Sequence, residues 1–133
     1  MTDSFPSLQF FQVHEFDSPD EPNSGELMDH DFVCKLDLLR QECGFPFRIT
    51  SGFRTEKHNA AIKGAQRSAH LLGRAVDISC GGGEAYTILK LAPKYGFFGI
   101  GIKQHGAGKL VHLDDIGFGE IEGISRPTLW TYP

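Results

Sequence analysis

Two histidines and one aspartate, well separated along the chain, form the sequence feature that most restricts how it can fold. The stretch SAHLLGRAVD contains His70 and Asp77, and His112 follows within the short segment VHLD. An aspartate inside an otherwise apolar strand would be costly to bury without a partner, and a metal ion removes that cost. Neutral imidazole and carboxylate groups suit Zn²⁺. The sequence therefore predicts a fold that brings His70, Asp77 and His112 together around one zinc ion.

The number of these ligands indicates the kind of zinc site. A structural zinc is closed by four protein ligands, whereas three protein ligands leave the fourth position open for water. We therefore interpret the chain as a small zinc hydrolase. A histidine taken alone is more often a core or surface residue, and it is the window with Gly73, Ala75 and Asp77 that favours a metal ligand.

These residues resemble the signature of the M15 peptidases, the group of zinc D-alanyl-D-alanine carboxypeptidases and endolysin peptidases. The matching pattern is S-x-H-x-x-G-x-A-x-D at residues 68–77, followed by H-x-D at residues 112–114. The likeness extends upstream to the SGFR segment (residues 51–54) and downstream to the RPTLWTY segment (residues 126–132), so it covers most of the chain. It implies a hedgehog/DD-peptidase-like zinc fold and a zinc metallopeptidase that hydrolyses amide bonds in bacterial cell-wall (peptidoglycan) peptides.

The resemblance also implies roles for Arg54 and Ser68. In the family, the arginine of the SGFR segment faces the substrate, where a planar guanidinium can bind a carboxylate or polarise a carbonyl group. The serine of the S-x-H pattern forms a hydrogen bond near the site. We therefore expect Arg54 to act in catalysis and in substrate binding, and Ser68 to contribute to substrate binding. A surface arginine without either role is the alternative for Arg54.

The general base is the part of the site that the sequence leaves open. Many family members carry Glu or Asp three residues before the last zinc histidine, but this chain has Lys109 there. Asp114 lies two residues after His112, so strand alternation puts both side chains on one face. We expect Asp114 either to act as the base or to orient a zinc histidine. His105 and Asp115 are the other candidates for the base.

Lys109 also keeps a second function open. Without an acid at that position, the chain could be a catalytically silent, zinc-stabilised module used for binding or as a phage structural component. Zinc-dependent hydrolysis of a small cytoplasmic dipeptide is a third, weaker interpretation. Digestion of peptidoglycan with and without a chelator would separate these three functions.

Length and charge limit the partners and the location that we expect. With 133 residues the chain has the size of one domain, spanning residues 1–133 with residues 1–28 as an N-terminal arm. A net charge of −4 argues against a nucleic-acid partner, and no apolar run reaches the roughly 18 residues of a membrane helix. The N-terminus lacks a signal-peptide pattern, so we expect synthesis in the cytoplasm, a phage or prophage origin and action on the cell wall. A monomer is expected, although nothing in the sequence fixes the oligomeric state.

Hydrophobic spacing predicts an α+β fold with a small, mostly antiparallel sheet and helices packed on one side. From Asp29 to Gly44, apolar residues recur at intervals of three and four, which predicts an amphipathic helix. The other expected elements are helices at residues 55–63 and 84–94 and strands at residues 45–51, 74–79, 98–102 and 109–114. Cys34 and Cys43 lie among the apolar residues of the first helix, and we expect both thiols to be buried.

Overall fold

Five strands form one mixed sheet in the computed structural model, which describes residues 4–133. The strands are β1 (Arg48–Ser51), β2 (Ala75–Ser79), β3 (Gly99–Lys103), β4 (Leu110–Asp114) and β5 (Thr128–Thr131). They lie in the order β1-β2-β4-β3-β5, and neighbouring strands are antiparallel except β3 and β5, which are parallel. The predicted α+β class is confirmed, and β5 is a strand that the sequence analysis did not predict.

The helices begin and end at residues suited to capping them. They are α1 (His30–Cys43), α2 (Glu56–Ala61) and α3 (Gly82–Leu91), and 3₁₀ turns cover Val13–Phe16, Ser24–Leu27, Ala69–Leu72 and Ala92–Tyr95. The Asp29 carboxylate accepts the amide of Phe32 at the start of α1, and Gly44 ends this helix with a φ of 81°. The Thr55 side chain caps α2 in the same way. In residues 4–133, no helix has the length and apolar character needed to cross a bilayer.

One face of the sheet is part of the hydrophobic core. Strands β2 and β4 contribute alternate residues to it, and α1 and α3 pack against them. The strand residues are Val76, Ile78, Val111 and Leu113, and the buried residues of α1 are Phe32, Val33, Leu36 and Leu39. Cys34 falls outside this buried stripe of α1 and is exposed, so the prediction of a buried thiol was wrong there. Cys43 is half-buried.

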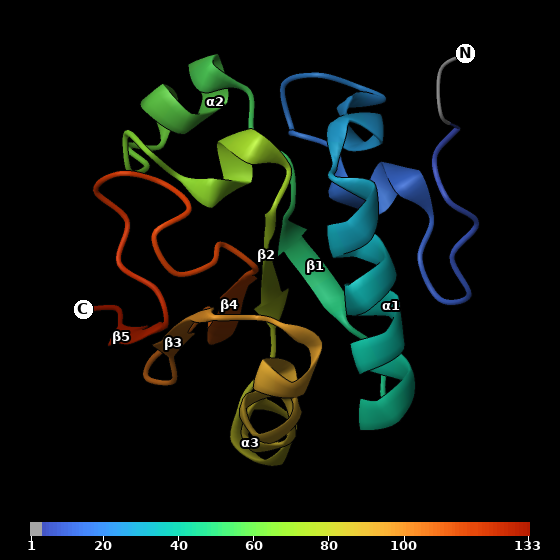
Figure 1. The fold of residues 1–133 in the computed structure, drawn as a ribbon, viewed down its shortest axis with the longest axis vertical. Helices are drawn as coiled ribbons and strands as arrows, with labels where there is room; N and C mark the ends of the chain where they lie inside the picture. The colour runs from blue at the N-terminus through green and yellow to red at the C-terminus, as the bar shows by residue number, and fades with distance from the viewer. Residues whose placement is uncertain (1–3) are drawn as a thin grey trace.

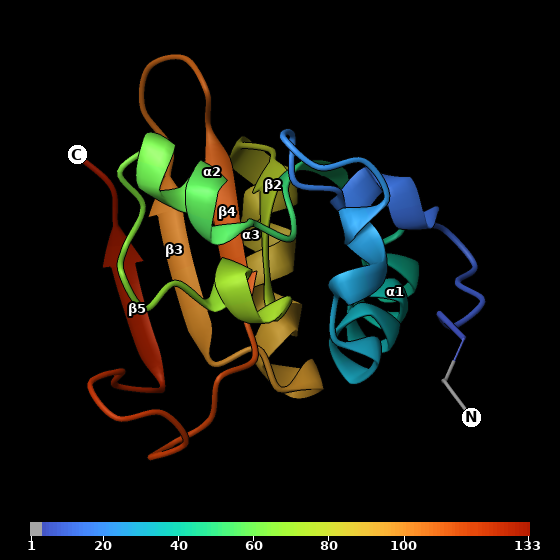
Figure 2. The same cartoon turned by 90° about the horizontal axis from the view of Figure 1, so that it is seen from above.

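The other face of the sheet is polar. Asp77 and His112 are register partners on β2 and β4, and Asp114 follows His112 on the same side of β4. The short helix α2 and the turn Ala69–Leu72 lie over this face, whereas α3 lies behind the sheet (Figures 1 and 2). The polar residues therefore lie between the sheet and its shorter covering segments.

The N-terminal arm is packed against the segments that surround this polar face. Phe16 is fully buried, and its carbonyl accepts the amide of Phe53 at 2.8 Å. A Cβ on Gly52 would lie 2.8 Å from the Cα of Phe16, so only glycine allows this approach. Directly after the arm, the amide of Asp29 donates to the carbonyl of Gly73 at 2.9 Å. Residues 1–3 of the expected arm lie outside the described residues.

Candidate metal centre

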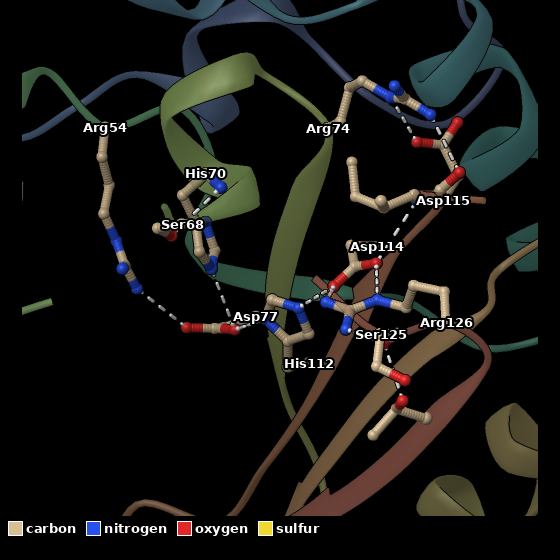
Figure 3. A network of polar contacts seen from close by, with 12 residues as sticks. Arg54, Ser68, His70, Arg74, Asp77, His112, Asp114, Asp115, Ser125 and Arg126 are labelled. Atoms are coloured by element: carbon tan, nitrogen blue, oxygen red, sulfur yellow. Dashed lines mark hydrogen bonds and ion pairs between the residues drawn. The ribbon is translucent and has the colours of Figure 1, made fainter. Parts of the chain in front are cut away.

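His70, Asp77 and His112 meet on the polar face of the sheet (Figure 3). His70 comes from the turn Ala69–Leu72, whereas Asp77 and His112 face each other across β2 and β4. Oδ1 of Asp77 lies 3.3 Å from Nε2 of His70 and 3.0 Å from Nδ1 of His112. All three side chains are buried, and one possible ligand atom of each lies within 4.8 Å of the others. The structure thus brings the three predicted zinc ligands into one cluster.

The hydrogen bonds of His70 determine which ring nitrogen faces the cluster. Its Nδ1 lies 2.8 Å from the Gly52 carbonyl oxygen, which can only accept, so Nδ1 carries the proton and Nε2 a lone pair. Within residues 4–133 this Nε2 atom is buried without a hydrogen-bond partner, and it faces the carboxylate of Asp77. Two lone pairs that face each other in a buried site repel unless a cation lies between them. The donor set therefore fits a metal ion.

His112 presents its other nitrogen to the cluster. In the neutral ring, Nε2 donates to Oδ2 of Asp114 at 2.8 Å, and the lone pair of Nδ1 faces Oδ1 of Asp77, 3.0 Å away. Asp114 is fully buried, and both of its oxygens accept from Arg126, at 2.9 Å from Nε and 2.7 Å from Nη2. A carboxylate that binds the second N–H of a metal-binding histidine fixes its tautomer and orientation. These contacts favour the orienting role for Asp114 over direct action as a base.

Burial and hydrogen bonding together set the charges of the cluster. Burial lowers the pKa of His70, which favours the neutral ring that a metal needs. Burial also opposes charge on His112, but the protonated ring can donate to both Asp114 and Asp77, and these hydrogen bonds outweigh burial and raise the pKa of His112. For Asp77, its interactions with His112 and His70 outweigh burial and hold its pKa below the usual range. Burial is likewise outweighed at Asp114, whose pKa falls to about 2 because of its bonds to His112 and Arg126.

Arg54 and Ser68 lie beside the three clustered side chains. Arg54 donates from Nη2 to Oδ2 of Asp77 at 3.4 Å and from Nη1 to Oδ1 of Asn59 at 3.2 Å. The Ser68 hydroxyl accepts the amide of His70 at 3.2 Å and caps the turn that carries this residue. Both residues line the cleft above the cluster. The structure thus puts both predicted substrate-binding residues next to the candidate metal centre.

The cluster forms part of the lining of a cleft of about 700 Å³. One wall runs from the end of α2 to the His70 turn, and the other consists of the loop after β4 together with β5. These walls contribute cationic and large apolar side chains, among them Lys63, Arg67, Ile124, Trp130 and Tyr132. In the part of the chain that the structure describes, Asp77 and Asp114 are the acidic residues that line the cleft.

Lys109 and the other two candidates for a general base, His105 and Asp115, are not part of the cleft lining. Lys109, at the position where many relatives carry an acid, is exposed and outside the cleft. His105 is exposed on the loop between β3 and β4. Asp115 is buried and forms ion pairs with Lys35 at 2.6 Å and Arg74 at 2.7 Å, which hold it outside the cleft lining.

The sequence analysis gave no role to Arg126 or Trp130. Arg126 binds Asp114, and the ring of Trp130 packs against His112 with the ring centroids 5.0 Å apart. Both residues belong to the RPTLWTY segment, which supported the family resemblance. The family resemblance of this segment could be recognised, but its local sequence does not indicate which side chains it contacts in the fold.

A comparison with protein families matches residues 11–114 to the family described as peptidase M15. The matched range contains Arg54, Ser68 and the three clustered residues, and it ends at Asp114. Arg126 and Trp130 lie beyond it. A comparison with curated proteins gives no match.

Proposed function

The chain belongs to the M15 peptidases, and on this basis we propose that it is a zinc metallopeptidase acting on bacterial cell-wall peptides. The bonds hydrolysed would be those cut by a D-alanyl-D-alanine carboxypeptidase or an endolysin. The observation that carries the proposal is the buried lone pair of His70 Nε2, which faces Asp77 beside Nδ1 of His112. Two imidazoles and one carboxylate are a ligand set that binds Zn²⁺ and leaves one coordination position for catalysis.

Bound zinc would act as a Lewis acid and lower the pKa of a water molecule to about 7. The chain's own contribution is to orient its ligands in advance. His70 would bind through Nε2 because Gly52 holds its other nitrogen, and His112 would bind through Nδ1 because Asp114 holds its Nε2. Asp77 would bind through Oδ1, since its Oδ2 is directed at Arg54.

We assign the binding of the substrate's carbonyl or carboxylate oxygen to Arg54. Its guanidinium is held by Ser51, Asn59 and Asp77, so its position is fixed before a substrate enters. Burial lowers the pKa of Arg54 from its usual value, but an arginine remains charged at neutral pH. Ser68 lines the same cleft, and we assign it to the substrate-binding surface.

The charge of the cleft supports the proposed substrate class. Lys63 and Arg67 line its wall, although the chain as a whole has a net charge of −4. Cell-wall peptides carry free carboxylates, which a cleft lined by cations attracts. The aromatic residues Trp130 and Tyr132 add an apolar surface against which a peptide can pack.

Digestion of purified peptidoglycan tests this function. The zinc-loaded protein, the chelator-treated protein and the zinc-treated Asp77→Asn variant are each incubated with it, and mass spectrometry identifies the released fragments. We expect fragments from the zinc-loaded parent alone, and their new termini identify the bond that is cut. A zinc-loaded parent that releases nothing from peptidoglycan or from a D-alanyl-D-alanine peptide contradicts the enzymatic assignment.

A catalytically silent zinc module is the second candidate, and one observation favours it. Lys109 occupies the position of the family's acid and is exposed outside the cleft. Within residues 4–133, the acidic residues that line the cleft are therefore Asp77 and Asp114. Such a module would bind zinc and gain stability from it, but it would leave peptidoglycan intact. The same digestion therefore separates the two candidates.

We also propose that residues 1–133 act as one peptidase domain and as a monomer. The contact between Phe16 and Phe53 supports the first part, because it joins the arm to the segment that carries Arg54. Light scattering of the zinc-loaded protein tests the second part.

A further inference from the structure

Arg126 makes a two-point contact with a residue that in turn holds a zinc ligand. Its Nε donates to Oδ1 of Asp114 at 2.9 Å and its Nη2 to Oδ2 at 2.7 Å, while the same Oδ2 accepts Nε2 of His112 at 2.8 Å (Figure 3). Asp114 has no solvent exposure. The plane of the guanidinium therefore fixes the carboxylate that orients the imidazole.

Arg126 also contacts the ring of Trp130, which in turn packs against His112. Its guanidinium carbon lies 5.1 Å from the centre of the Trp130 ring, and this ring packs on the His112 ring with centroids 5.0 Å apart and an interplanar angle of 51°. A cation over an indole face is attracted by the ring's electrons. His112 is thus held by a carboxylate through its Nε2 and by an indole against its ring, and Arg126 contacts both.

Neither Arg126 nor Trp130 lies in the range that matches the family, which ends at Asp114. We propose that Arg126 is a positioning residue of the metal centre: through Asp114 and Trp130 it keeps His112 turned so that Nδ1 faces Asp77 and His70. This inference rests on the proposed function, since it takes the three clustered residues as zinc ligands. Arg126 acts through other residues and does not itself touch the ion.

A neighbouring ion pair provides a matched control. Asp115, the residue after Asp114, is paired with Arg74 at 2.7 Å, and Arg74 also pairs with Glu120. Both arginines thus bind a buried aspartate at the end of β4, but only the Arg126 pair contacts a proposed zinc ligand. A purely structural role predicts similar effects for Arg126→Lys and Arg74→Lys, whereas a positioning role predicts different ones.

The experiment measures zinc affinity by chelator competition and the absorption spectrum of the cobalt-substituted protein, together with melting temperature. Arg126→Lys keeps the charge but loses the planar fork, and we expect zinc affinity to fall by about tenfold or more, with a changed cobalt spectrum. Arg74→Lys should lower the melting temperature while leaving affinity and spectrum as in the parent. Unchanged affinity and spectrum in Arg126→Lys, or equal changes in both variants, overturn the proposal.

A second variant covers the case in which a single substitution unfolds the protein. Arg126→Gln combined with Asp114→Asn leaves no unpaired buried charge, so it should melt close to the parent and yet bind zinc more weakly. Parental zinc affinity in this double variant overturns the proposal. None of these readouts needs turnover: a parent that binds zinc without hydrolysing peptidoglycan refutes the proposed function alone. A parent that binds no zinc refutes both.

Discussion

At the scale of single residues, the candidate centre depends on which nitrogen of each histidine carries a proton. The Gly52 carbonyl holds the proton of His70 on Nδ1, and Asp114 holds that of His112 on Nε2. In its neutral form, each imidazole therefore presents a lone pair toward Asp77. The partners of the outer nitrogens thus fix the tautomer and orientation of both rings.

Replacing one of these donors should remove the metal. We expect the parent to hold one zinc, and zinc at a hundred times its dissociation constant should stabilise the fold by about 2.7 kcal/mol. His70→Ala should lose both the metal and this stabilisation, whereas His105→Ala, at an exposed histidine outside the cleft, should keep both. Elemental analysis and thermal melting measure the outcome. Full zinc content in His70→Ala would refute the ligand assignment.

Arg54 should matter for turnover more than for folding. Removal of one fixed donor to a developing oxyanion costs about 100-fold to 1,000-fold in rate, and we expect Arg54→Ala to show a loss of that size. Zinc content should stay at the parental level, because Arg54 is not among the clustered donor residues. Steady-state kinetics with a cell-wall peptide check this prediction. A large drop in melting temperature with unchanged turnover per folded molecule would contradict it.

The sequence was sufficient to predict the clustered residues because the family pattern carries both their types and their spacing. His70, Asp77 and His112 come together as predicted, with Arg54 beside them. Arg126 could not be found in this way, because its reach to Asp114 depends on the path of the loop that follows β4. No local pattern encodes that path.

At the scale of elements, strand β3 has a glycine at the position that pairs with Asp114 of β4. Gly99 pairs with Asp114 on one side and with Thr128 on the other, and a Cβ on Gly99 would collide with the Asp114 carboxylate. Two strands along from Asp77, this glycine therefore leaves space for the carboxylate that orients His112. Strand β3 therefore contributes space to the candidate site, whereas β2 and β4 contribute Asp77 and His112.

Filling that space should disturb the centre. Gly99→Ala forces the methyl group against Asp114, and overpacking of this kind costs about 1–3 kcal/mol. We expect a lower melting temperature together with weaker zinc binding, since Asp114 must move away from His112. Gly83→Ala is the control, because a Cβ there meets nothing within 4 Å. Zinc affinity at the parental level in Gly99→Ala would show that the carboxylate position is not critical.

The elements that the sequence analysis missed are those with weak local patterns. Strand β5 has only four residues, follows Pro127 directly and pairs in parallel with β3, a partner far from it in sequence. A run this short cannot be distinguished from a loop by alternation alone. The long helix α1, by contrast, carries its own cap, stripe and terminating glycine, and its bounds matched the prediction closely.

At the scale of the whole molecule, the N-terminal arm and the C-terminal segment both pack around the candidate metal centre. The arm holds the SGFR segment through Phe16 and Phe53, while the C-terminal segment holds His112 through Arg126 and Trp130. From the sequence, residues 1–28 are expected to form an N-terminal arm, with no helix or strand predicted in it. The structure shows which aromatic residues of the arm are buried: Phe11 and Phe16 belong to the core, whereas Phe10 is exposed.

The stability of the whole protein should respond to pH in opposite ways with and without zinc. The pKa of His112 is raised above its unfolded value, so protonated His112 stabilises the metal-free fold below about pH 6.5. That stabilisation is lost as the pH rises through the folded pKa. Zinc binding needs neutral His112. The stabilisation of the fold by zinc should therefore grow as the pH rises over the same range, and zinc binding should release about one proton. Calorimetry in buffers of different ionisation enthalpy measures the release, and zinc affinity independent of pH would contradict it.

The ion pair between Arg126 and Asp114 also has a consequence for when the candidate metal centre forms during synthesis. A ribosome releases the chain from its N-terminus, so His70, Asp77 and His112 emerge before the arginine that steadies the last of them. Until residue 126 has left the ribosome, the nascent chain lacks the contact between Arg126 and Asp114 that orients His112. The centre would then bind its metal tightly only after residue 126, which follows the last proposed ligand in the chain, has folded onto Asp114.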